Sequence, residues 1–184
     1  TNEVDELCIY ETANFTDIST IAAGNIVNWA WNFGDATSQT GLRNVQKNYI
    51  LARVYEVELV VESDSGCTDV ATQKIEMLPK PAVDFTFRDT CEGFGVEFAN
   101  QSTVVKGQMS FTWDFGDNNK STLKEPTHTY ATAGNYDVTL IGISTDGCLD
   151  TAGPKNIIIH EVPVATITSN IGVFEFCEGD SAVL

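Results

Sequence analysis

Residues with side chains suited to binding a metal ion gather near position 117. Asp117, Asn119 and Ser121 stand at alternate positions, the spacing at which a calcium-binding loop supplies oxygen ligands. An EF-hand loop would also need glycine where Thr122 stands and glutamate where His128 stands. We therefore expect no bound cofactor, and Ca²⁺ at this position is the alternative to be tested.

Residue types that serve in hydrolysis are also present but do not combine into a site. The run GDS at residues 179–181 is similar to the nucleophile phrase of some esterases, and the histidines of the chain are His128 and His160. Neither histidine has a matched serine or cysteine partner in the sequence. We therefore expect no enzymatic activity and no catalytic residue.

The cysteines indicate disulfide chemistry instead. They form no C-x-x-C pair, which argues against a zinc site. Widely spaced cysteines are typical of disulfide-bonded proteins in oxidising compartments, so an extracellular protein is expected. The disulfide candidates are Cys8, Cys67, Cys91, Cys148 and Cys177.

The charge of the chain argues against two classes of partner. Asp and Glu number 26 against 10 Lys and Arg, a net charge of -16, and such a field repels nucleic-acid phosphates and anionic lipid headgroups. No run of 18 apolar residues occurs, so we expect no membrane insertion. The opening residues TNEVDELC contain neither an initiator Met nor a signal peptide, which indicates a piece of a longer mature protein.

The second half of the sequence repeats the first half. The two copies share residue types in the same order, at an offset that falls from 83 to 81 along the chain. Such a drift is expected where loops gain or lose single residues. The matched pairs are Cys8 with Cys91, Phe15 with Phe98, Trp31 with Trp113, Phe33 with Phe115, Gly34 with Gly116, Asp35 with Asp117, Tyr49 with Tyr130, Tyr55 with Tyr136 and Cys67 with Cys148.

The repeat divides the chain into units. Residues 1–79 form unit 1, a divergent copy for which we consider a shortened first strand, and residues 80–162 form unit 2. Residues 163–184 begin a third unit, because the phrase Cys-Glu-Gly of unit 2 recurs there. The seams at 77–82 and 160–165 are short and contain proline, so the units are expected to lie end to end.

The hydrophobic pattern within each unit alternates as in β-strands. Large apolar residues recur at every second position of VNWAWNF (27–33) and MSFTWDF (109–115), and no segment combines a 3.6-residue apolar stripe with helix caps. Short strands separated by turns predict an all-β chain with one β-sandwich per unit. The residues expected to face inward are Val27, Trp29, Trp31, Phe33, Met109, Phe111, Trp113 and Phe115.

Three phrases of unit 2 carry a resemblance to a known family. WDFGD (113–117), EPTHTY (125–130) and AGNYDVTL (133–140) resemble the PKD repeat, an immunoglobulin-like sandwich. The added cysteines make the units similar to PKD repeats in long surface proteins of Bacteroidota, including gliding adhesins and other cargo of the type IX secretion system. Unit 1 departs from the family pattern at Asn32, where the family has Asp. The resemblance covers residues 8–163 and implies tandem immunoglobulin-like (PKD) β-sandwiches arranged end to end.

The repeated Phe-Gly-Asp phrase is interpreted as a structural corner. Its glycine can adopt the positive φ that a sharp corner needs, and the following Asp can accept hydrogen bonds from N–H groups of the turn. We therefore expect structural rather than chemical roles for the motif residues Trp31, Phe33, Gly34, Asp35, Trp113, Asp114, Phe115, Gly116, Asp117, Tyr130 and Tyr136.

Two disulfide schemes are consistent with the sequence. Similar spacing within the units favours Cys8 with Cys67 and Cys91 with Cys148. Strand order in an immunoglobulin-like sandwich instead places the two cysteines of one unit at opposite ends, which favours Cys8 with Cys148 across the seam. The second scheme leaves Cys67 and Cys91 for neighbouring units, and in both schemes Cys177 expects a partner beyond residue 184.

These features predict a non-enzymatic stalk or spacer in a large secreted cell-surface protein, an adhesin. The expected partners are neighbouring repeats of the same chain, with other cell-surface or secretion-machinery proteins as further candidates. The expected location is extracellular, at a bacterial cell surface. The alternative is an accessory polymer-binding module of a secreted hydrolase, which predicts exposed aromatic side chains in a row.

Overall fold

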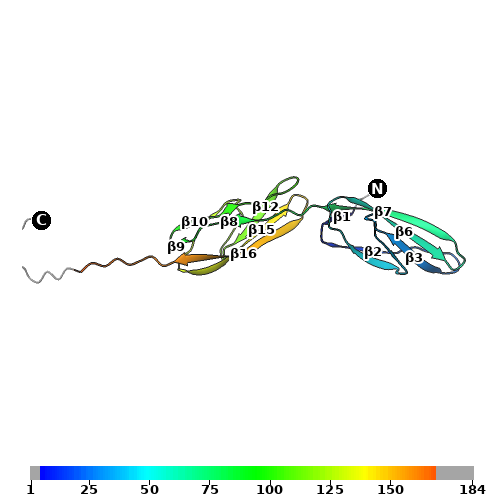
Figure 1. Cartoon of the computed structure of the whole chain (residues 1–184), viewed down its shortest axis with the longest axis horizontal. Helices are drawn as coiled ribbons and strands as arrows, with labels where there is room; N and C mark the ends of the chain where they lie inside the picture. The colour runs from blue at the N-terminus through cyan, green and yellow to red at the C-terminus, as the bar shows by residue number, and fades with distance from the viewer. Residues whose placement is uncertain (1–4, 169–184) are drawn as a thin grey trace, which may run out of the picture.

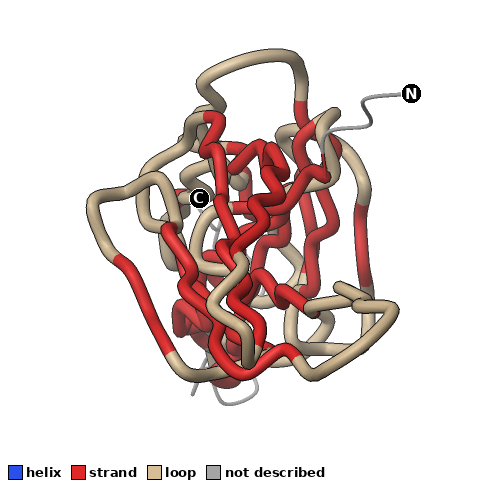
Figure 2. The backbone as a smooth tube through the Cα atoms, turned by 90° about the vertical axis from the view of Figure 1, so that its right-hand side faces the viewer, coloured by secondary structure: helices blue, strands red, loops and turns tan. Residues whose placement is uncertain are grey.

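The computed structural model describes residues 5–168, and within them every regular element is a strand. Two β-sandwiches follow one another along the long axis of the molecule (Figure 1). The view along that axis shows the strands of the sandwiches with no helix among them (Figure 2). No helix that could cross a membrane is found between residues 5 and 168. The all-β prediction and the tandem arrangement are confirmed.

Unit 1 folds as a five-stranded sheet packed on a two-stranded sheet. Its described strands are β1 (Asp5–Cys8), β2 (Thr12–Thr16), β3 (Ile26–Asn32), β4 (Ser38–Thr40), β5 (Asn44–Asn48), β6 (Val54–Ser63) and β7 (Thr68–Leu78). The larger sheet has the order β1-β7-β6-β3-β4, and the smaller sheet pairs β2 with β5. Among the described strands of unit 1, only β1 runs parallel to its neighbour, β7.

Unit 2 repeats this architecture, except that its smaller sheet is divided into two pairs of strands. Its described strands are β8 (Phe85–Thr86), β9 (Thr90–Cys91), β10 (Gly95–Glu97), β11 (Ala99–Asn100), β12 (Met109–Asp114), β13 (Lys120–Ser121), β14 (Thr127–Thr129), β15 (Gly134–Ser144) and β16 (Leu149–His160). The larger sheet has the order β13-β12-β15-β16-β9, and the pairs β10-β14 and β11-β8 lie opposite. The strand β9 runs parallel to β16, as β1 runs parallel to β7.

Each sandwich encloses a separate hydrophobic core. Alternating apolar side chains from the two sheets meet between them, as strand geometry requires. In unit 2 the ring of Phe98 lies 5.5 Å from Trp113 and 5.2 Å from Phe115, measured between centroids. Trp31 and Phe33, the counterparts of Trp113 and Phe115, are also buried in unit 1. The strand predictions for the repeated phrase therefore agree with the core positions of these four residues.

Two apolar residues differ from their predicted places. Val27 was expected to face inward but is 55% exposed. The pairing of β3 with β6 shifts between Ile26 and Asn28, so Val27 is the extra residue of a bulge and leaves the alternation. Met77 was assigned to the seam, but β7 extends to Leu78 and Met77 belongs to the core of unit 1.

The first strand of unit 2 changes sheets part-way along its length. The segment β8 pairs with β11, whereas β9 pairs with β16 in the other sheet. By the repeat, the counterpart of β8 in unit 1 would fall on residues 2–3, which lie outside the described residues, so the shortened first strand stays a prediction. Most of the predicted third unit, with Cys177, also lies outside them.

Candidate functional site

The Phe-Gly-Asp phrase of unit 2 forms a sharp corner at the end of β12. The Phe115 N–H donates to the Asn119 carbonyl oxygen at 3.1 Å, and Gly116 between them has φ +80°. A Cβ atom at Gly116 would lie 2.7 Å from the carbonyl oxygen of Asp137 on β15. Glycine is therefore required for the backbone conformation and for the close approach of two strands.

Unit 1 builds the same corner at the end of β3. The Phe33 N–H donates to the Thr37 carbonyl oxygen at 3.1 Å. Gly34 has φ +73°, and a Cβ atom there would lie 2.6 Å from the carbonyl oxygen of Glu56. The repeated phrase is thus a repeated piece of backbone geometry.

The residue before Phe-Gly-Asp is acidic in one unit and neutral in the other, and both serve the turn equally. Asp114 Oδ1 accepts a hydrogen bond from the Gly116 N–H at 3.1 Å, and Asn32 Oδ1 accepts the same bond from Gly34 at 3.1 Å. The bond from Gly116, followed by Lys120, lowers the pKa of Asp114. The turn needs a side-chain oxygen here rather than a charge.

Buried donors attach the corner to the core. The Tyr130 hydroxyl donates to the Phe115 carbonyl oxygen at 3.0 Å, and Trp113 Nε1 donates to the Leu123 carbonyl oxygen at 2.9 Å. Burial, and then the nearby charge of Asp117, raises the pKa of Tyr130, which therefore remains a donor. Unit 1 has the equivalent bonds from Tyr49 to Phe33 and from Trp31 to Leu42.

Asp117 is held by neighbouring donors. Its Oδ1 accepts from the Asn119 N–H at 3.1 Å, and its Oδ2 lies 2.7 Å from His128 Nε2. Burial acts to raise the pKa of Asp117, but the bonds from Asn119 and His128 outweigh burial, so the pKa lies below its ordinary value. Ser121 Oγ instead accepts from the Leu123 N–H. Residues 5–168 contain no cluster of three or more metal-binding side chains.

The same place in unit 1 holds a lysine. Lys47 Nζ lies 2.7 Å from Asp35 Oδ2 and 5.2 Å from the centroid of the Phe33 ring. In unit 2, the His128 ring stacks on Phe115 at 4.2 Å. Both units therefore cover the corner phenylalanine with a side chain that also contacts the corner Asp.

Asp17 is a buried carboxylate that the sequence interpretation missed. Its Oδ1 accepts from the Ser19 N–H at 2.8 Å, and its Oδ2 accepts from Trp29 Nε1 at 2.8 Å. Burial acts to raise its pKa, but the bonds from Ser19 and Trp29 outweigh burial and the net shift is downward. The available signal was the repeat, which matches Asp17 to Asn100 in unit 2. Asn100 Oδ1 accepts the equivalent hydrogen bond from the Ser102 N–H.

The tryptophans do not form an exposed row. Trp31 and Trp113 lie in the cores, and Trp29 is half-buried. Two aromatic side chains are largely exposed among the described residues, Tyr10 at 62% and Phe94 at 59%. Each lies just after the first cysteine of its unit. The aromatic platform that a polymer-binding module would present is therefore not built from the tryptophans.

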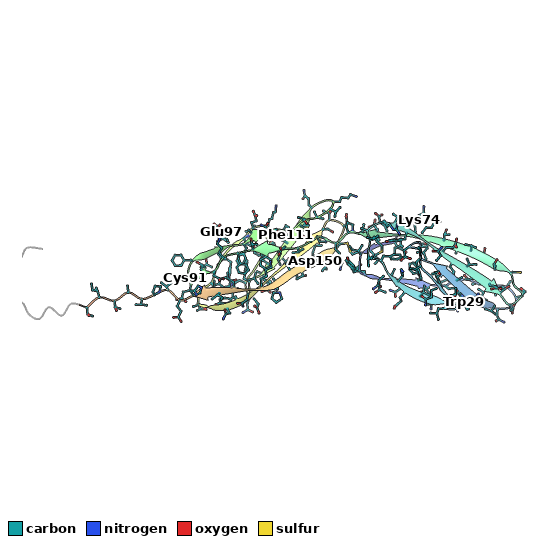
Figure 3. All side chains as sticks on the ribbon, in the orientation of Figure 1. Trp29, Lys74, Cys91, Glu97, Phe111 and Asp150 are labelled. Atoms are coloured by element: carbon teal, nitrogen blue, oxygen red, sulfur yellow. A yellow bond between two sulfur atoms is a disulfide. The ribbon has the colours of Figure 1, made fainter. Side chains whose placement is uncertain are left out.

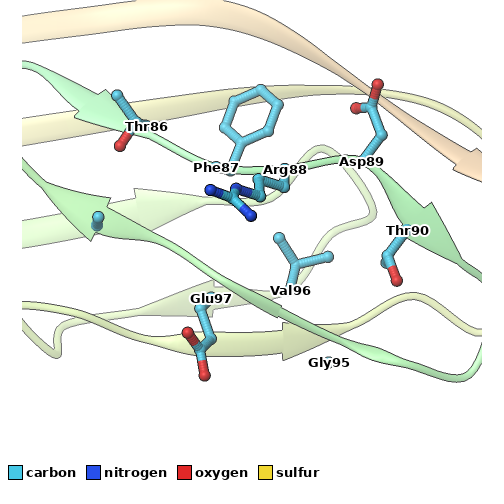
Figure 4. Close-up of a pocket in the computed structure, with 9 residues that line it drawn as sticks. Thr86, Phe87, Arg88, Asp89, Thr90, Gly95, Val96 and Glu97 are labelled. Carbon is cyan, nitrogen blue, oxygen red and sulfur yellow. The ribbon is translucent and has the colours of Figure 1, made fainter.

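A groove of about 570 Å³ lies beside the sheet change in unit 2. Figure 4 shows Arg88 and Glu97 among its lining residues. Asp89, also at the groove, accepts a hydrogen bond from the Ile158 N–H at 3.1 Å and so holds β16. The groove follows from the crossing of residues 87–89 between sheets, and we assign it no chemistry.

A disulfide between Cys8 and Cys148 joins the two units across the seam. Cys8 ends β1 in unit 1, and Cys148 lies in the turn between β15 and β16 in unit 2. Their Cα atoms are 5.7 Å apart although 140 residues separate them, and both cysteines are buried. Of the two pairings left open by the sequence, the structure contains the one between units.

The other described cysteines remain thiols. Cys67 is exposed and Cys91 is partly exposed. Figure 3 shows Cys91 at the end of unit 2 that faces away from unit 1. Cys177 lies outside the described residues.

Comparison with protein families agrees with this doubled sandwich. The PKD domain model matches twice, over residues 2–77 and 79–158. The chain belongs to the PKD domain family. The two PKD matches cover unit 1 and unit 2 in turn.

Individual proteins resemble parts of this PKD chain. A microbial collagenase of Vibrio alginolyticus is 32% identical over 93 residues, which is 50% of this chain and 11% of the relative. Collagenase ColA of Clostridium perfringens is 30% identical over 76 residues, covering 41% of this chain and 7% of the relative. The match thus spans about a tenth or less of each relative's length.

Solved PKD structures also resemble part of this chain. The PKD1 domain of Vibrio anguillarum Epp is 26% identical, with a TM-score of 0.41, covering 45% of this chain and 96% of that domain. The PKD1 domain of the Vibrio cholerae metalloprotease PrtV is 34% identical, with a TM-score of 0.40, covering 44% and 98%.

Proposed function

We propose that this chain is a non-catalytic accessory segment of a secreted hydrolase, in which the two PKD units form a stiff spacer. PKD domains are generally non-catalytic modules. The collagenase relatives support the class of parent protein, because the matched region is a small part of each enzyme. The comparisons therefore favour the accessory-module alternative over the adhesin stalk that the sequence predicted.

The disulfide between Cys8 and Cys148 is the observation that carries the spacer role. Two domains connected only by a linker move relative to each other by default. Here the peptide seam and the disulfide attach unit 2 to unit 1 at two points, which restricts hinge motion. The bond is also consistent with extracellular localisation, because disulfides persist in oxidising compartments.

The spacer role can be tested with the natural thiols Cys67 and Cys91, one in each unit. Both are labelled with maleimide spin labels in a chain that carries Cys177→Ser, and the distance distribution is measured by pulsed electron resonance. We expect a narrow distribution for the disulfide-bonded chain. The Cys8→Ser/Cys148→Ser double variant should give a broad one. Equally broad distributions in both chains would overturn the spacer role.

Polymer binding by the segment itself requires a separate test, because the largely exposed aromatic side chains within residues 5–168 are Tyr10 and Phe94 rather than a row of tryptophans. The purified chain is sedimented with insoluble collagen. A pure spacer stays in the supernatant. Sedimentation that is abolished in a Tyr10→Ala/Phe94→Ala variant would add collagen binding to the function.

The second candidate function is the stalk of a cell-surface adhesin, including gliding adhesins exported by the type IX system. The observation that favours it concerns Cys67 and Cys91, which are thiols although their counterparts in the repeat, Cys148 and Cys8, are bonded to each other. The sequence of the intact parent protein, read by mass spectrometry, distinguishes the candidates. A catalytic domain beside these units supports the hydrolase, and a long array of units without one supports the adhesin.

A further inference from the structure

Cys91 lies in the same backbone framework as the bonded Cys8. Cys8 is paired with Leu78 in the parallel register of β1 and β7, and Cys91 is paired with His160 in that of β9 and β16. In both units the residue after the cysteine donates its N–H to the carbonyl oxygen of that partner at 2.9 Å. We call these two positions first-type cysteines.

Cys67 lies in the same turn as the bonded Cys148. The Ser63 N–H donates to the Cys67 carbonyl oxygen at 2.9 Å, and the Cys67 N–H donates to Ser63 Oγ at 3.1 Å. The corresponding distances between Ser144 and Cys148 are 2.8 and 3.2 Å. We call Cys67 and Cys148 second-type cysteines.

In the disulfide between the units, the first-type Cys8 of one unit bonds the second-type Cys148 of the next. We call this head-to-tail pattern the pairing rule. We propose that Cys67 and Cys91 are disulfide sites for a preceding and a following PKD unit, each joined in this head-to-tail manner. Cys67 then takes a first-type cysteine, and Cys91 takes a second-type cysteine. Cys177 follows the Cys-Glu-Gly pattern of Cys91 in the sequence, so by the repeat it corresponds to Cys91 and is not the expected partner of Cys91.

The exposure of the four described cysteines fits the pairing rule. At the formed junction, Cys8 is 9% exposed and Cys148 is fully buried. Cys67 and Cys91 lie in equivalent frameworks but are exposed and partly exposed. In the proposed arrangement, an adjoining unit would bury each of these two cysteines. Unit 1 therefore carries one unbonded cysteine, Cys67, and unit 2 carries the other, Cys91, and each could bond an adjoining unit.

Each new bond requires an electron acceptor. Two thiols lose two protons and two electrons as the S–S bond forms, and a disulfide donor such as oxidised glutathione or a thiol oxidoreductase accepts them and becomes two thiols. An oxidising compartment supplies such donors. The same pairing applies whether the parent protein is a hydrolase or an adhesin.

The Cys91 site can be tested by adding a third unit to the full chain. A second copy of residues 81–162 is inserted after Val162, with Cys177→Ser. The copy carries Val105→Ala and Thr151→Ser, two exposed positions, so that its cysteine peptides differ in mass from those of unit 2. The protein is oxidised with a glutathione mixture. Peptide mapping without reduction should find Cys91 bonded to the inserted counterpart of Cys148. The native bond between Cys8 and Cys148 in the same digest verifies folding. Cys91 remaining a thiol beside that native bond would overturn the proposal.

The Cys67 site has a matched test at the other end. A copy of residues 1–83 is placed before Thr1, with Ile18→Val and Thr72→Ser in the copy at two exposed positions so that its cysteine peptides have distinct masses. Peptide mapping should find the copy's counterpart of Cys8 bonded to Cys67. In both extended chains the matched control replaces the tested residue, Cys91→Ser or Cys67→Ser, and should leave the added cysteine as a thiol. Bonding of the added cysteine within its own unit would contradict the pairing rule.

Discussion

Cys8, near the start of unit 1, is paired in register with Leu78, the last residue of β7. The disulfide to Cys148 therefore attaches the first strand of unit 1 to unit 2 beside the point where the chain itself crosses the seam. Both ends of unit 1 are held by unit 2. Unit 1 can then unfold only as a closed loop.

Loss of this bond should destabilise unit 1. The Cys8→Ser variant is expected to lower its free energy of unfolding by up to about 4 kcal/mol, because the bond and the seam together close a loop of about 70 residues. Urea denaturation measures the change, and Cys67→Ser, which removes a thiol with no disulfide partner in residues 5–168, is the control. Unchanged denaturation in Cys8→Ser would contradict the closed-loop argument.

The corner glycine should tolerate no side chain. Gly116→Ala is expected to cost about 3 kcal/mol, because the Cβ atom meets the Asp137 backbone. Gly93→Ala is the matched control, since Gly93 has a similar φ of +79° but nothing within 4 Å of its Cβ position, and its cost is expected to be about 1 kcal/mol. Thermal unfolding compares the two, and equal losses would refute the contact.

Removal of the buried tyrosine hydroxyl should weaken unit 2. Tyr130→Phe leaves the Phe115 carbonyl oxygen without its donor and is expected to cost about 1 to 3 kcal/mol. Tyr136→Phe removes a bond to Thr132 at the surface, where water can replace the donor, so a loss below about 1 kcal/mol is expected. The order of the two losses in denaturant titrations is the decisive result.

Acid should weaken unit 2 partly through Asp117. Its pKa in the folded protein lies below the ordinary value of 3.8, so its stabilising contribution is present above that value and is lost as the pH falls through the folded pKa. Asp117→Asn should therefore show a smaller decrease in stability between pH 5 and pH 2 than the unchanged chain. Parallel pH curves would show that the His128 and Asn119 contacts contribute little.

Much of the corner was predictable because its causes are local. The glycine, the following Asp and the buried aromatic residues stand within a few positions of each other, and the repeat identifies them without a structure. Asp17 and Lys47 were missed because their roles depend on partners brought from other strands. The bulge at Val27 was also missed, since strict alternation contains no sign of an inserted residue.

The sequence by itself determined the all-β class, the two units and the corner, since alternation, repetition and turn residues act over short distances along the chain. Only the tertiary structure decided which cysteines pair. Cys8 is closer in sequence to Cys67 than to Cys148, yet the two cysteine types belong to opposite ends of each sandwich. A disulfide forms where Cα atoms come within about 6 Å, and that distance depends on how two folded units meet.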